Sequence, residues 1–154
     1  MSTDDVAYGY LGGACSSETG EIALFGDSAG LTRFCRFVEA LDENASHRYP
    51  LDAPRDVSLY DERLDAIEVQ LLPIAVAANP EPLRIQRDPL AASLRVSGSR
   101  LGLETFSAVL RSLTPPLPAG VRTARHGHIE PDPDGVHIAA DSASVVVYRE
   151  PDNE

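Results

Sequence analysis

One stretch of this chain occurs twice without insertions or deletions, and this repeat constrains the fold more than any other feature. Residues 26–41 align with residues 98–113, and Gly, Gly, Leu, Phe and Leu are identical at five matched positions. Self-similarity at a fixed period indicates that one supersecondary unit is used more than once. We therefore expect a tandem duplication of a strand–helix–strand unit. The first unit is predicted at residues 1–77 and the second at residues 78–154, in one shared globular domain.

Each copy carries the signals of a capped amphipathic helix. Asp27 and Ser99 follow the first glycine of each copy and can accept hydrogen bonds from the free amides of a first helical turn. Apolar residues then recur at the i, i+3, i+4, i+7 spacing of a buried helical stripe. These are Leu31, Phe34, Cys35, Val38 and Leu41 in the first copy, and Leu103, Phe106, Val109, Leu110 and Leu113 in the second. We expect helices that end near Asp42 and before Thr114, with Cys35 as a core residue.

Short apolar or alternating runs before and after these helices predict strands. The predicted strands are residues 6–10, 22–25, 56–60, 66–72, 83–86, 94–96, 126–130, 135–138 and 143–148. Residues 78–82 are expected to link the units, and residues 132–135 to form a turn. The resulting fold class is α+β, with mostly antiparallel sheet and one long helix per unit packed on a face. Pairing of the two units would bury both helical stripes in one core.

The charge of the chain excludes several classes of function. The 154 residues include 24 acidic residues and 13 arginines but no lysine, for a net charge of −11. The absence of lysine excludes a phosphate-loop lysine, a Schiff base and a lysine general base. Nucleic-acid binding through a basic surface is not expected. The acidic N-terminus, the two cysteines without Cys-x-x-Cys spacing and the lack of a long apolar run favour a cytoplasmic protein without a membrane span.

Most of the negative charge lies in the first unit, which has 14 acidic residues and 5 arginines, a net −9. The charge is densest between Glu39 and Glu68, where tyrosines are interleaved with the acids, and Tyr is a common interface anchor. This segment could be a solvated helix end and loop, or a face that binds a basic partner. The candidate partner-binding residues are Asp42, Glu43, Asp52, Asp56, Tyr60, Asp61, Glu62, Asp65 and Glu68.

A second candidate site is the sequence from His126 to Glu130. His126, His128 and Glu130 alternate along a predicted strand and so share one of its faces, with His137 beyond the predicted turn. Such a row could hold a metal ion, although zinc needs three or four convergent ligands. It could also be a solvated polar face, since the predicted strand 56–60 of the first unit has no histidine. No nucleophile elbow or Cys–His pair is present, so we expect neither catalysis nor a cofactor.

The second unit resembles a known family. It contains Gly98-Ser-Arg-Leu-Gly-Leu103 at the helix start, then His126-Gly-His-Ile-Glu130, then Asp141-Ser-Ala-Ser-Val-Val-Val147. This order resembles the thirty-second immunity-protein family of bacterial polymorphic toxin systems, whose members share a Gly-Asp-x-x-Gly-Leu helix start. That start stands most clearly in the first unit, from Gly26 to Leu31. The resemblance covers residues 92–149 well and residues 20–72 in part.

The resemblance implies a cytosolic antidote that binds and neutralises one cognate toxin without catalysis. The acidic first unit adds the hypothesis that the toxin is basic, for example a nuclease whose nucleic-acid groove an acidic face could occupy. We expect a monomer or homodimer that binds neither nucleic acid nor membrane. Two alternatives remain open at this stage: a metal- or small-ligand-binding α+β module, and a scaffold or assembly protein.

Overall fold

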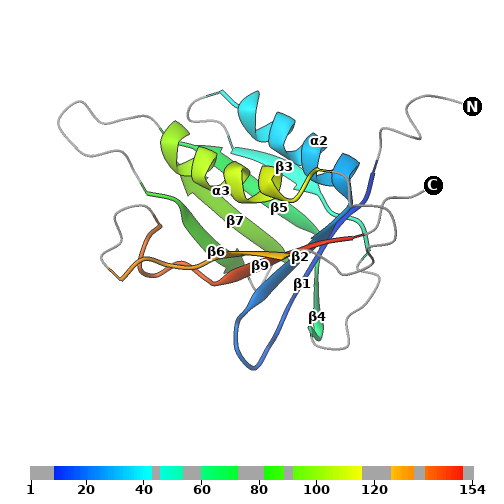
Figure 1. Cartoon of the computed structure of the whole chain (residues 1–154). Helices are drawn as coiled ribbons and strands as arrows, with labels where there is room; N and C mark the ends of the chain where they lie inside the picture. Colours follow the sequence, from blue (N-terminus) through cyan, green and yellow to red (C-terminus); the bar gives the residue numbers. More distant parts are fainter. Residues whose placement is uncertain are drawn as a thin grey trace, which may run out of the picture.

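The computed structural model describes residues 9–42, 46–53, 60–72, 82–88, 92–115, 126–133 and 138–150. Within these residues the protein is α+β, as predicted, with two helices and two sheets (Figure 1). The helices are α2 (Ser28–Glu39) and α3 (Arg100–Ser112). The strands are β1 (Leu11–Cys15), β2 (Ile22–Gly26), β3 (Ser46–Pro50), β4 (Glu62–Leu64), β5 (Ala66–Leu71), β6 (Arg84–Asp88), β7 (Ser93–Gly98), β8 (His126–Ile129) and β9 (Val145–Arg149).

The strands form two mostly antiparallel sheets. Sheet A has the order β4-β1-β2-β9-β8, and sheet B has the order β3-β5-β7-β6. Each sheet contains one parallel pair, β2 with β9 in sheet A and β5 with β7 in sheet B. Each parallel pair joins a strand from the first half of the chain to a strand from the second half, so neither sheet is made by one half alone.

The two sheets are built in the same way. In sheet A the hairpin β1–β2, which precedes α2, lies beside the hairpin β8–β9, which follows α3. In sheet B the hairpin β6–β7, which precedes α3, lies beside the pair β3–β5, which follows α2. The hairpin before each helix and the strand pair after it therefore belong to different sheets, while β4, which follows α2, lies at the edge of sheet A beside β1.

Both helices begin where the sequence predicts, because the predicted capping side chains are in place. The Oδ1 atom of Asp27 accepts hydrogen bonds from the backbone amides of Gly30 at 2.8 Å and of Tyr10 at 2.9 Å. The Oγ atom of Ser99 accepts one from the amide of Gly102 at 3.2 Å. Asp27 thus caps α2 and also fixes the chain that enters β1.

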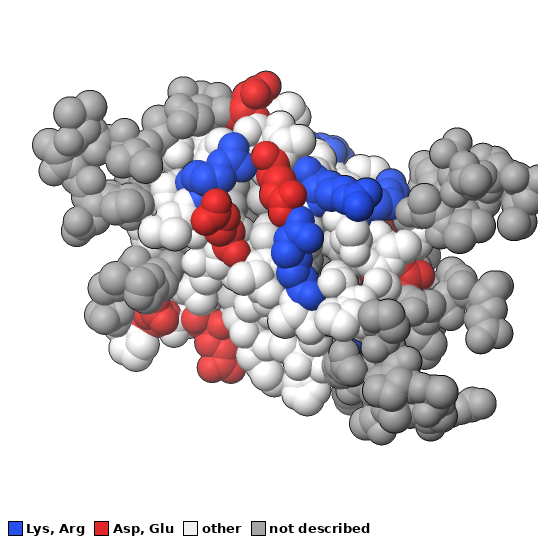
Figure 2. All heavy atoms as spheres, turned by 45° about the horizontal axis from the view of Figure 1, so that its top comes forward, with Lys and Arg blue, Asp and Glu red and all other residues white. Residues whose placement is uncertain are grey.

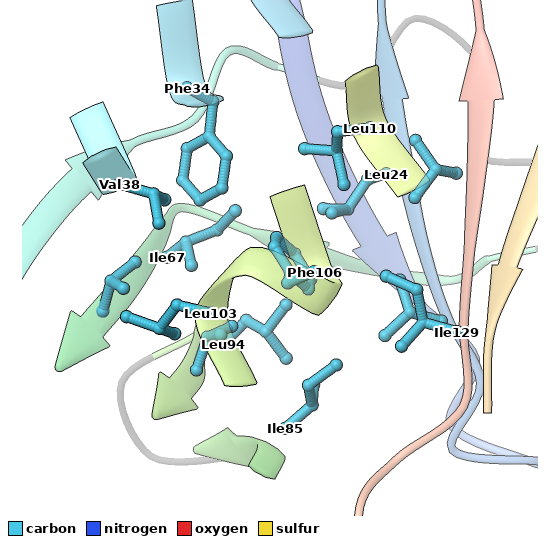
Figure 3. Close-up of a cluster of buried hydrophobic side chains, with 14 of the residues drawn as sticks. Leu24, Phe34, Val38, Ile67, Ile85, Leu94, Leu103, Phe106, Leu110 and Ile129 are labelled. Carbon is cyan, nitrogen blue, oxygen red and sulfur yellow. The ribbon is translucent and has the colours of Figure 1, made fainter. Parts of the chain in front are cut away.

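The main hydrophobic core lies between the two helices and the two sheets (Figure 3). Phe34 and Val38 of α2 and Phe106 and Leu110 of α3 point into one cluster with side chains from both sheets. Cys35 is fully buried in this cluster, which confirms its prediction as a core residue. The apolar stripes of the two predicted helices therefore share one core.

Three strands are absent from the sequence prediction: β1, β3 and β4. β1 contains Gly12 and Gly13, which are poor strand formers. A Cβ atom on Gly13 would approach side-chain atoms of Leu51 and Leu24 to about 3 Å, so glycine lets these side chains pack on the strand. Packing, rather than local propensity, makes β1 a strand.

Several predicted elements lie wholly or largely outside the described residues. These are the predicted strands 6–10, 56–60 and 135–138 and the predicted linker 78–82, of which only residues 9, 10, 60, 82 and 138 are described, together with half of the predicted turn at 132–135. The strand that pairs with β5 as β8 pairs with β9 is β3, whereas all of the predicted strand 56–60 except residue 60 lies outside the described residues. β3 carries His47, so the first half does place a histidine on the strand that corresponds to β8.

Candidate partner-binding surface

The predicted acidic residues are divided among several parts of the structure. Glu43 and Asp56 lie outside the described residues. Asp42 is exposed just beyond the end of α2, on the helix side of the molecule. Asp52 is also exposed, and its Oδ2 atom accepts a hydrogen bond from the amide of Leu11 at 3.0 Å, which ties it to the start of β1. The described acids of the segment 39–68 therefore lie on different parts of the structure.

Arginines pair with three of the remaining predicted acids. Glu68, on β5, lies between Arg48 of β3 at 3.5 Å and Arg95 of β7 at 3.8 Å, on the face of sheet B away from the helices. Asp65 pairs with Arg63 at 3.2 Å. Glu62 pairs with Arg87, which comes from the second half of the chain. Nearby positive charge therefore offsets much of the negative charge at these positions.

Three acids without an ion pair to a described residue lie at the turn between β1 and β2. We define the acidic tip as Glu18, Glu21 and Asp61, none of which forms an ion pair with another described residue. Asp61 is held against this turn because its carboxylate accepts hydrogen bonds from the amide and the hydroxyl of Ser17. These hydrogen bonds lower the pKa of Asp61. Asp61 is therefore a fully charged, oriented carboxylate at neutral pH.

Sequence reasoning missed Glu18 and Glu21 because they lie far from the dense acidic segment along the chain. The polar run from Ser16 to Glu21, between two apolar runs, was the available signal for a turn. What the sequence did not reveal is that β4 pairs with β1, which brings Asp61 beside that turn. In Figure 1 the β1–β2 hairpin and β4 extend to the side opposite the helices.

Tyr60 lies behind the acidic tip and is mostly buried, with 7% of its surface exposed. Its hydroxyl donates to Oε1 of Glu21 at 2.9 Å and lies 3.3 Å from the hydroxyl of Tyr148. Burial, followed by these two hydrogen bonds, raises the pKa of Tyr60, so it stays a neutral donor. Tyr60 therefore supports Glu21 from behind and offers little surface of its own to a partner.

A row of rings crosses sheet A on the face away from the main core. We define the aromatic row as Phe25, Tyr148, His126 and His128. Phe25 stacks on Tyr148 with ring centres 5.3 Å apart, and Tyr148 lies 6.2 Å from His126. Phe25, Tyr60 and Val146 belong to a second, smaller apolar cluster on this face. Exposure increases along the row, from buried Phe25 through half-buried Tyr148 to the exposed histidines.

The predicted metal ligands belong to the end of this row. His126 and His128 are exposed on β8 with their ring centres 5.0 Å apart, and Glu130 follows the strand. His137 lies outside the described residues. In the part of the chain that the structure describes, no three His, Cys, Asp or Glu residues are grouped so that they could hold a metal ion.

The helix side of the molecule carries charges of both signs. Figure 2 shows acidic and basic side chains next to one another on this side, without a continuous patch of either. Glu39 of α2 pairs with Arg111 of α3 across a groove of about 610 Å³ between the helices. Arg100 and Glu104 also line that groove. Neither described helix is long and apolar enough to span a bilayer.

The second half of the chain is similar to a known protein family. The family model of Immunity protein 32 matches residues 93–150. The matched segment, as we call these residues, contains β7, α3, β8 and β9, and it agrees closely with the range 92–149 of the sequence resemblance. The match does not extend to the first half, where the sequence suggested a partial resemblance. No curated protein and no solved structure shows a significant match to the chain.

The candidate surface joins the matched segment to the first half of the chain. Tyr148, His126 and His128 lie in the matched segment, whereas Glu18, Glu21 and Asp61 precede it. The hydroxyl groups of Tyr60 and Tyr148 are where these two parts meet. One side of sheet A therefore presents charged carboxylates beside partly exposed rings.

Proposed function

We propose that this protein is an immunity protein that neutralises one cognate bacterial toxin by binding it, without catalysis. The observation that carries this proposal is the match of residues 93–150 to Immunity protein 32. The matched segment includes the partly exposed end of the aromatic row, which is of the kind that protein partners contact. The two alternatives, a metal- or small-ligand-binding α+β module and a scaffold or assembly protein, receive no comparable support from the described residues.

We further propose that the toxin is basic and contacts the acidic tip together with the aromatic row. Surface carboxylates steer a basic protein toward its binding surface and raise the association rate. Tyrosine is enriched among the residues that contribute most to binding energy, and exposed rings can stack on arginine side chains of a partner. Asp61 is already oriented by Ser17, so little side-chain entropy is lost when it binds.

Only some of the predicted binding residues belong to the proposed contact with the toxin. Asp61 remains at its centre, and Glu18 and Glu21 are added. Glu62, Asp65 and Glu68 are expected to contribute less because arginines pair with them. Asp42 and Asp52 are expected to lie outside the contact.

Co-expression with a toxin domain encoded by a neighbouring gene would test the proposal. The wild-type chain should restore growth of a bacterial host that expresses the toxin domain. The double reversal Glu18→Arg and Asp61→Arg should reduce protection. A matched double reversal on the helix side, Asp42→Arg and Glu104→Arg, changes the net charge equally and should protect as the wild type does.

These experiments distinguish the immunity function from the role of the acidic tip as its binding surface. Failure of the wild-type chain to protect, at a confirmed level of soluble protein, would contradict the immunity function itself. Full protection by the Glu18/Asp61 variant would leave the immunity function standing and refute the acidic tip as its binding surface.

A further inference from the structure

Residues at equivalent positions of the two repeats touch each other along the contact between α2 and α3. The rings of Phe34 and Phe106 lie 5.9 Å apart, and both side chains are fully buried. The Sγ atom of Cys35 lies 3.7 Å from the carbonyl oxygen of Ser107. Glu39 pairs with Arg111. In a twofold symmetric dimer, residues near the axis contact their own copies in the partner, and these pairs follow that pattern.

The two helices also exchange hydrogen bonds reciprocally. Ser28, the first residue of α2, donates from Oγ to the carbonyl oxygen of Thr114 at 2.6 Å, just beyond the end of α3. Arg100, the first residue of α3, donates to the carbonyl oxygen of Leu41 at 2.9 Å, just beyond the end of α2. Ser28 and Arg100 themselves occupy equivalent positions in the two aligned repeats. The start of each helix therefore satisfies carbonyl groups at the end of the other.

The backbone contacts between strands follow the same equivalence. The amide of Leu72, after β5, donates to the carbonyl of Gly98, and the amide of Glu150, after β9, donates to the carbonyl of Gly26, both at 2.8 Å. Gly26 and Gly98 are the first residues of the two aligned repeats. The strands that leave each half thus end on equivalent positions in the other half.

We infer that the chain is a single-chain dimer of two units, each a hairpin, a helix and a second pair of strands, that have exchanged their C-terminal strand pairs. In this arrangement the matched segment is not self-contained. Its β7 lies in sheet B and its β8–β9 hairpin lies in sheet A, and the parallel partners of β7 and β9 both come from the first half. The face of α3 and the inner edges of β7 and β9 form an interaction surface that fits a second unit of the same kind.

The pair Glu39–Arg111 specifies which second unit this surface accepts. Two copies of the first unit would bring two glutamates together at this position, and two copies of the second would bring two arginines together. Like charges placed opposite each other disfavour an incorrect pairing, whereas opposite charges favour the correct one. The surface on the matched segment therefore fits a unit with an acidic residue at the position equivalent to Arg111.

A disulfide formed in the folded full chain tests the exchange directly. Ala23 of β2 lies opposite Val146 of β9, and also opposite Ala14 of β1. The test chain carries a protease site between Leu72 and Pro82 and the substitutions Ala23→Cys and Val146→Cys. It is oxidised first and cleaved afterwards. The two fragments should then stay linked on a non-reducing denaturing gel. The control with cysteines at 14 and 23 should release them, because both positions belong to one fragment.

The same cleaved chain without added cysteines tests whether the halves depend on each other. The fragments should co-elute in a 1:1 ratio at the size of the intact chain. The inference is overturned if the Ala23/Val146 variant releases its fragments after oxidation, or if the cleaved halves separate and each stays folded.

Charge exchange in the intact chain tests the specificity of the pairing. Glu39→Arg or Arg111→Glu alone should lower the melting temperature by roughly 1–3 °C, and the two together should restore it. Glu104 lines the same groove without an ion pair to a described residue, so Glu104→Arg should not rescue Arg111→Glu. Equal melting temperatures for the single and double variants would contradict the role of this pair.

Discussion

The fully buried side chain of Arg149 donates a hydrogen bond from Nε to the carbonyl oxygen of Leu113 at 2.9 Å. This bond joins the last strand, β9, to the residue that ends α3. It satisfies a carbonyl group that the helix itself leaves unpaired. The core therefore contains an arginine whose role is to close the end of a helix.

Replacement of Arg149 by Ala should destabilise the protein by roughly 2–4 kcal/mol, because the change leaves the buried Leu113 carbonyl unpaired and opens a cavity. Denaturation in urea would measure this loss of unfolding free energy. Arg100→Ala is the matched control, since Arg100 performs the same task at the end of α2 but is only half-buried, and it should cost less. Equal losses for the two variants would contradict the role assigned to burial.

The two helix caps should contribute unequally to the free energy of unfolding. Asp27→Ala should cost about 2 kcal/mol and Ser99→Ala about 1 kcal/mol, because Asp27 serves two backbone amides and Ser99 serves one. Chemical denaturation of both variants would measure the difference. Asp27→Asn keeps an acceptor oxygen and should recover part of the loss. If Ser99→Ala proved the more damaging change, the second contact of Asp27 would have no energetic weight.

The sequence was sufficient to predict the parts of the fold that local patterns specify. The caps at Asp27 and Ser99 and the apolar stripes around Phe34 and Phe106 gave both helices, because spacing and capping act within a few residues. The same local signals gave β5, β7 and β8 closely. β1 was missed, since its two glycines form a strand only through packing.

The arrangement of the strands and of the charges could not be predicted in this way. Local sequence does not specify that β9 pairs with β2 and β5 with β7, because those contacts join positions far apart along the chain. For the same reason the density of acids between Glu39 and Glu68 did not reveal which of these acids pair with arginines. Arg87 and Arg95, which pair with Glu62 and Glu68, come from the second half.

The two cysteines should be unreactive in the folded protein. Burial raises the pKa of the Cys35 thiol to about 11 from 9.0, and it also raises the pKa of Cys15. A thiol reagent at pH 8 should label neither residue in the native protein and should label both in urea. Rapid labelling of one thiol under native conditions would contradict the packing of the core around it.

The same shift predicts how stability depends on pH. Cys35 is neutral in both the folded and the unfolded chain below pH 9, so its contribution is fully present there. Between pH 9 and about pH 11 the unfolded chain loses its thiol proton while the folded chain keeps it, so stability should fall. Cys35→Ala should reduce this dependence when denaturation midpoints are compared across that range.

The most direct test of the proposed function is the affinity of the purified chain for a catalytically inactive form of the adjacent toxin domain, measured by calorimetry at low and high salt. The wild-type chain should bind with a 1:1 stoichiometry and more weakly at high salt, because exposed charges are screened. The Glu18→Arg/Asp61→Arg variant should bind at least about tenfold more weakly, a loss of about 1.4 kcal/mol. The Asp42→Arg/Glu104→Arg control should keep the wild-type affinity. Equal affinities for the wild-type chain and both variants would contradict the acidic tip, and no binding by the wild-type chain would contradict the function itself.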